Sequence, residues 1–112
     1  MTILEAMTQL DTLKPNRYTQ ENKLRWLTEV DAAAAAVLGR NPPDYTDAMD
    51  GLLLLPIPFD GAYLRYMEAQ IAYHDGAFSA YEAAMGRYEA VFDAFRKDHR
   101  RGHVPERKGV FL

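Results

Sequence analysis

The chain has 112 residues, of which 48% are hydrophobic and 12% aromatic, so we expect a single folded domain. It contains no cysteine, which excludes disulfide bonds and thiolate metal sites. The longest apolar runs, residues 32–38 and 52–59, are much shorter than the ~20 residues of a membrane-spanning helix. Because the first five residues also do not resemble a signal peptide, we expect a protein that is made in the cytosol and does not enter a membrane.

The charge is unevenly distributed. The net charge is −3, yet residues 96–112 hold six Lys or Arg against two acidic residues, +4, which leaves −7 for the rest of the chain. A basic end on an acidic body favours contact with acidic proteins or nucleic acid. A solvated basic patch that suits the negative end of a helix dipole is an equally good interpretation.

Two helices are predicted in the first forty residues. Thr2 and Glu5 have the spacing of a capping box, and Pro15 ends the helix that follows. Thr19 is a suitable N-cap for a second helix, which runs to about residue 38 with a wide apolar face. Asp31 interrupts that face, and we expect its carboxylate at the solvent-exposed margin rather than in the core.

Residues 39–59 differ from the rest of the chain. Pro42 and Pro43 break helical structure, and three aspartates at positions 44, 47 and 50 lack the alternate spacing of a calcium-binding loop. Pro56 and Pro58 exclude a helix from the apolar stretch 52–59, so we expect an extended arm.

Two further helices are predicted beyond the arm. Asp60 can cap a helix that runs to residue 74, and Gly76 marks the turn that follows. The last helix carries an aromatic seam spaced alternately by three and four residues, which predicts a core face: Phe78, Tyr81, Met85, Tyr88, Phe92, Phe95 and His99. The predicted fold is therefore all-α: two helical hairpins within residues 1–100, a long extended loop between helices two and three, and a flexible C-terminal tail, residues 101–112.

No pattern in the sequence predicts catalysis. The only serine, Ser79, has no histidine at a suggestive spacing, and Gly102 interrupts the helix that would pair His99 with His103. We therefore expect a protein that is not an enzyme, without catalytic residues, cofactor or metal.

Several segments together resemble a known family. They are residues 13–19, residues 23–31, the stretch Leu53 to Asp60, residues 63–71, and the later positions Gly76, Tyr81, Met85, Tyr88 and Phe92. This series is similar to the small helical head–tail connector (adaptor) proteins of tailed phages and prophages. The segment 39–51 departs most from that pattern.

The resemblance implies a structural virion protein at the head–tail junction, present in the host cytoplasm during assembly. Such proteins form a ring of about a dozen copies between portal and tail. The implied partners are further copies of the chain, the portal protein, a tail-side or stopper protein, and genomic DNA that passes without sequence recognition. An alternative is a prophage-encoded helical regulatory or nucleic-acid-binding protein that acts through its basic tail.

We expect the interface to lie on the arm and the basic end. The predicted interface residues are Leu53, Leu54, Leu55, Ile57, Phe59, Arg96, Arg100, Arg101, Arg107, Lys108 and Phe111.

Overall fold

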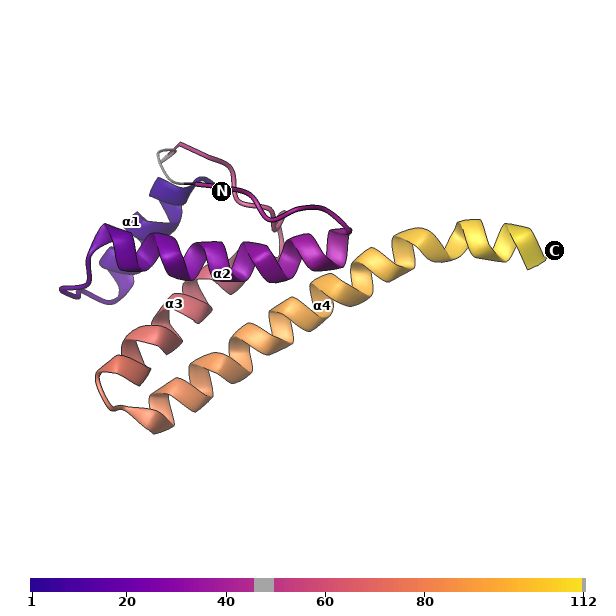
Figure 1. The fold of residues 1–112 in the computed structure, drawn as a ribbon. Helices are drawn as coiled ribbons and strands as arrows, with labels where there is room; N and C mark the ends of the chain where they lie inside the picture. Colours follow the sequence, from indigo (N-terminus) through magenta and orange to yellow (C-terminus); the bar gives the residue numbers. More distant parts are fainter. Residues whose placement is uncertain (46–49, 112) are drawn as a thin grey trace.

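The computed structural model describes the backbone of residues 1–45 and 50–111, and the side chains of those residues up to position 102. Four helices, α1 (Ile3–Leu13), α2 (Gln20–Leu38), α3 (Gly61–His74) and α4 (Phe78–Phe111), account for most of the described backbone (Figure 1). The all-α prediction is confirmed, and so are the two hairpins and the long loop between α2 and α3. No described helix is long and apolar enough to cross a membrane.

The predicted caps of the first hairpin are present. The Thr2 side chain accepts a hydrogen bond from the Glu5 amide, and the Glu5 carboxylate accepts one from the Thr2 amide. The Thr19 hydroxyl accepts from the Asn22 amide at 3.1 Å and starts α2. Gly39 ends α2 with φ of 70°, a left-handed conformation that glycine adopts without strain.

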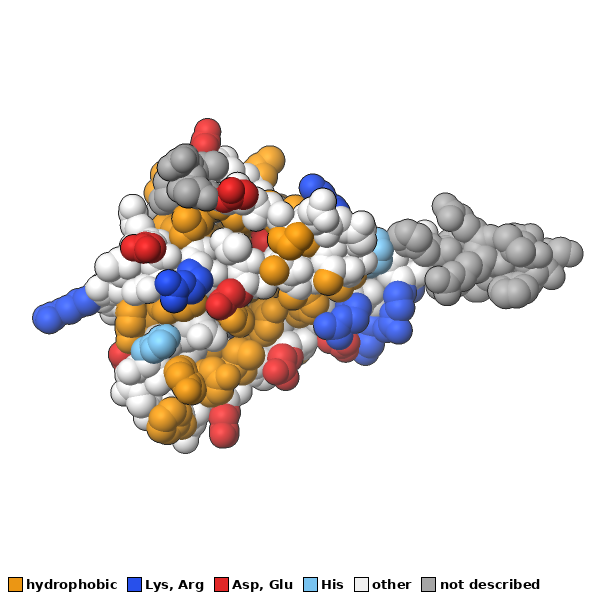
Figure 2. Space-filling model, in the orientation of Figure 1, with side chains coloured by type: hydrophobic (Ala, Val, Ile, Leu, Met, Phe, Trp, Pro, Cys, Tyr) orange, Lys and Arg blue, Asp and Glu red, His pale blue; other side chains and the backbone are white. Residues whose placement is uncertain are grey.

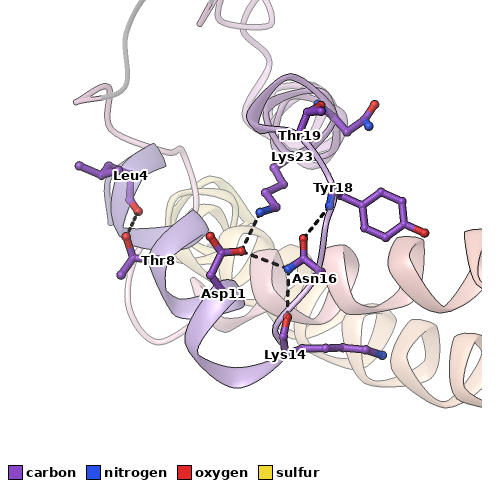
Figure 3. A network of polar contacts seen from close by, with 9 residues as sticks. Leu4, Thr8, Asp11, Lys14, Asn16, Tyr18, Thr19 and Lys23 are labelled. Atoms are coloured by element: carbon purple, nitrogen blue, oxygen red, sulfur yellow. Dashed lines mark hydrogen bonds and ion pairs between the residues drawn. The ribbon is translucent and has the colours of Figure 1, made fainter.

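Side chains in the short link between α1 and α2 set how these helices meet. The Lys23 ammonium on α2 lies 2.6 Å from an Asp11 carboxylate oxygen on α1, and the same oxygen accepts from the Asn16 amide (Figure 3). Asn16 also accepts from the Tyr18 amide and donates to the Lys14 carbonyl (Figure 3). Lys23 is only 5% exposed but the Asp11 side chain is 53% exposed, so this ion pair is partly shielded from water and links the two helices of the hairpin.

The prediction that Asp60 caps α3 with its side chain is wrong. Asp60 occupies the N-cap position, but its backbone is already helical and its carboxylate makes no capping hydrogen bond. The turn before α3 is instead closed by the backbone, where the Phe59 amide donates to the Pro56 carbonyl at 2.7 Å.

α3 is the central helix of the fold. It contacts α1, α2 and α4, and it packs most extensively along α4, its hairpin partner (Figure 1). Six of its side chains are at most 1% exposed: Ala62, Tyr63, Met67, Ala69, Ile71 and Ala72. Since α1 and α4 lie on different parts of α3 and do not contact each other, the helices form a layered arrangement and not a closed bundle.

The aromatic seam of α4 is divided between core and surface. Phe92 and Phe95 are buried, at 5% and 4% exposure, and Phe95 packs edge-on against Phe59 of the arm. Phe78, at the start of the helix, is 59% exposed. The expectation that the whole seam forms core is therefore wrong for its first ring, because α2 reaches only the middle of α4 (Figure 1).

The end of α4 projects from the body. The sequence predicts that the regular helix ends near His99, yet the backbone continues as helix to Phe111, well beyond the other helices (Figure 1). Residues 101–112, predicted to form a tail, thus include a helical extension that leaves the packed domain.

The division of the seam predicts unequal effects of truncating its rings. Phe95→Ala should lower the free energy of unfolding by about 3–5 kcal/mol, because it opens a cavity in the core. Phe78→Ala should change it by less than about 0.5 kcal/mol, because that ring is largely in solvent. Urea unfolding followed by circular dichroism measures both values, and equal losses would contradict the division.

Candidate functional site: a buried carboxylate and the surfaces it positions

Asp31 is the centre of a buried polar network. It is fully buried, so the expectation of a solvent-exposed margin is wrong. Its carboxylate accepts hydrogen bonds from the hydroxyls of Tyr45 and Tyr63, the latter at 2.5 Å, and from the Leu54 amide at 3.1 Å. The Tyr63 hydroxyl in turn accepts from the Leu55 amide at 2.7 Å. A helix residue thus satisfies polar groups of the loop that would otherwise be buried without partners.

The surroundings of Asp31 shift the pKa of its carboxyl. Burial raises the pKa of this carboxyl above its usual value, and the hydrogen bonds from the two tyrosines and the Leu54 amide oppose that rise without cancelling it. Burial also raises the pKa of Tyr45 and Tyr63, and the adjacent Asp31 charge adds to the effect, so both phenols keep their protons.

The network fixes the arm, residues 52–59, on its own domain. The start of the arm also pairs with the N-terminus, where the Ile3 amide donates to the Gly51 carbonyl and the Leu53 amide donates to the Met1 carbonyl, each at 3.0 Å. Leu53 and Leu55 are 7% and 1% exposed and belong to the core. These two predicted interface residues are therefore used inside the chain.

The remaining arm residues lie nearer the surface. Leu54 and Phe59 are half-buried against the core, while Ile57 is 82% exposed. A partner can therefore reach the second half of the arm, close to the two prolines, and also Leu52 at its start, which is 70% exposed.

The second half of the arm meets the basic part of α4. A shallow hollow of about 590 Å³ is lined by Phe59, Ala94, Lys97, Arg100 and Arg101, and blue side chains gather near the projecting end in Figure 2. We call these five residues the basic hollow. The sequence predicted Phe59, Arg100 and Arg101 as interface residues but gave no sign that they are neighbours.

The cations near this hollow remain accessible. Lys97 lies 3.0 Å from Asp93, one turn earlier, and Arg101 lies 3.8 Å from Asp98. Arg96, another predicted interface residue, lies with its guanidinium 5.2 Å from the centre of the Phe92 ring. Exposed pairs of this kind contribute little and are easily exchanged for a partner's charges. The side chains of Arg107, Lys108 and Phe111 lie outside the described residues.

The described part of the chain offers no arrangement for metal binding. No group of three or more His, Asp or Glu side chains there is placed to hold a metal ion. Ser79 is exposed at the start of α4. Glu68 accepts from Arg65 on its own helix at 2.8 Å, and Glu82 is exposed on α4.

Comparison with known proteins gives no relative. No family model, no curated protein and no solved structure matches this chain.

Removing one hydroxyl should test the network. Tyr63→Phe deletes a donor to Asp31 and the acceptor of the Leu55 amide, so it should lower the free energy of unfolding by about 1–3 kcal/mol. The matched control, Tyr73→Phe, removes a hydroxyl from a ring that is 51% exposed and should change little. Urea denaturation measures both. A loss no larger than that of the control would show that the network does not hold the loop.

The pKa of Asp31 predicts a pH dependence. Because this pKa is raised on folding, the native state binds the proton more tightly, and this stabilising contribution decreases as pH rises above the unfolded value of about 3.9. The Asp31→Asn variant lacks this titration. The free energy of unfolding of the native chain should exceed that of the variant by the largest amount near pH 4. This difference should shrink towards neutral pH. Urea unfolding of both proteins across that range measures the difference, and an advantage that grows with pH would refute the prediction.

Proposed function

We propose that this chain is a structural subunit of a tailed-phage head–tail junction, an adaptor that assembles as a ring between portal and tail around the DNA channel. The resemblance in residues 13–96 supports this proposal, together with the helical body. In this role the protein is not an enzyme, and it acts in the virion after assembly in the host cytoplasm.

The observation that carries the proposal is the basic hollow. It combines the arm, through Phe59, with the basic part of α4, through Arg100 and Arg101, although these segments are about forty residues apart in sequence. An apolar floor surrounded by cations suits an acidic, partly apolar protein surface. A portal or tail-side protein is the partner of that kind in a head–tail junction.

The Asp31 network is consistent with such a role. An adaptor that contributes a docking surface needs a loop held in one conformation before binding, since ordering it at the interface would cost affinity. Asp31 provides this order from within the domain, because it holds the Leu54 amide directly and the Leu55 amide through Tyr63.

Charge reversal at the basic hollow tests the function. Arg100→Glu combined with Arg101→Glu should weaken binding to the portal protein of the same genome by at least tenfold and leave the melting temperature unchanged, because both residues are exposed. The control pair, Arg17→Glu and Arg25→Glu, changes the net charge equally at exposed sites elsewhere. Copurification with the portal ring and negative-stain imaging measure binding.

Two outcomes would contradict the proposal. One is failure of the unmodified chain to bind the portal or tail-side protein. The other is binding of duplex DNA that weakens steeply as salt rises and is lost in the Arg100 and Arg101 variant, which would favour the nucleic-acid-binding alternative.

A further inference from the structure

An exposed set of aromatic side chains lies on the α3–α4 hairpin, away from the basic hollow. Tyr73 and Phe78 are 51% and 59% exposed, and their ring centres are 6.0 Å apart. Tyr81 packs on Tyr73 at 5.3 Å. Large rings left in solvent at one place are typical of a contact surface. We call these two rings, together with the half-buried Tyr66, Tyr81, Met85 and Tyr88 beside them, the aromatic face.

The aromatic face continues into a hollow between α2 and α4. Tyr66 and Tyr88 pack at 5.0 Å between ring centres, and Tyr88 also lines a hollow of about 660 Å³ with Ala33 of α2 and Gly86 of α4. Figure 2 shows a continuous band of hydrophobic side chains along α4 beneath α2. The band has the form of a groove that accepts a helix.

The edges of this groove carry more negative than positive charge, although Arg96 also lines its hollow beside Glu89 and Asp93. Glu29 of α2 is exposed and accepts a hydrogen bond from the Tyr66 hydroxyl at 2.8 Å. Glu82 and Glu89 precede and follow Met85 by three and four residues, so they share its side of α4, and both are exposed. A helix that binds here is therefore favoured if it is basic as well as apolar.

The chain itself contains one segment with these properties. Residues 97–112, which follow the Arg96 that lines the hollow, carry a charge of +3, and their sequence includes Val104, Val110, Phe111 and Leu112. Residues 96–111 continue α4 and span about 22 Å at 1.5 Å per residue, close to the length of the stretch 78–92 that borders the groove. α4 is one helix in the structure, and its end points away from its own aromatic face (Figure 1).

We propose that the C-terminal end of α4 in one copy binds the aromatic face of another copy. This contact joins two different surfaces, so each copy keeps a free end and a free face, and repetition generates a closed ring or an open filament. This inference identifies the contact between neighbouring copies in the proposed adaptor. It rests on the proposed function only in taking the assembly to be a ring and not a filament.

Because the chain lacks cysteine, a pair of designed cysteines can test the contact directly. Gly86→Cys places a thiol in the hollow, where nothing lies within 4 Å of an added Cβ atom. Gly109→Cys places one near the end of α4 and retains every apolar and basic residue. When the two variants are mixed in full-length form and treated with a short bis-maleimide, we expect a covalent dimer of one copy of each.

The control replaces Gly86→Cys with Leu4→Cys, at an exposed site on α1. Equal yields of dimer from the two mixtures, or no dimer from either, would overturn the inference. Since only the isolated chain is used, the result is independent of portal binding: a specific dimer from a chain that does not bind the portal would refute the proposed function alone.

Sedimentation of cysteine-free proteins provides a second measure. Phe78→Ser removes an exposed ring from the aromatic face and should weaken self-association by at least tenfold, while Leu4→Ser, from a site of 52% exposure, should not. Unchanged association of the Phe78 variant, together with an unchanged melting temperature, would show that copies meet through another surface.

Discussion

The fold depends on a single buried carboxylate. Asp31 accepts three hydrogen bonds, two from tyrosine hydroxyls and one from the backbone of the arm. Burying an unpaired carboxylate would be very costly, so its position inside α2 is tolerable only if the loop between α2 and α3 closes over it. The same closure satisfies the loop's own amides, because the Leu55 amide bonds to Tyr63. Helix and loop therefore stabilise each other.

This mutual dependence determines which surfaces are available. Because the network draws Leu53 and Leu55 into the core, the arm is exposed at Leu52 and in its second half, where Phe59 meets Phe95 and the cations of α4. At the start of α4 the same seam leaves Phe78 in solvent, because α2 does not extend that far. A small domain thus presents two contact surfaces of different chemistry, one basic and one aromatic with acidic edges. Two unlike surfaces are what a subunit needs if it is to meet both its neighbours and a separate partner.

Local sequence rules were sufficient to predict the four helices and several of the residues at which they begin or end. The capping box at Thr2, the cap at Thr19 and the stop at Gly39 depend on a few adjacent residues, and all three are present. The rules failed at Asp60, whose side chain makes no capping bond, and at the end of α4, where the backbone continues as helix past Gly102 and Pro105. The residue at which a helix ends is decided by small differences in free energy, so a neighbouring turn or helix can shift it.

The sequence by itself determined an all-helical chain with two hairpins, an interrupting extended loop and a basic end, because periodicity, prolines and charge are local properties. Only the tertiary structure decided that Asp31 is buried and that Phe78 is exposed, although the sequence pattern placed the first at a helix margin and the second in a core stripe. The tertiary structure also brought Phe59 beside Arg100 and Arg101. The reason is physical: helical periodicity shows which side chains share a face, whereas burial depends on which other segment covers that face.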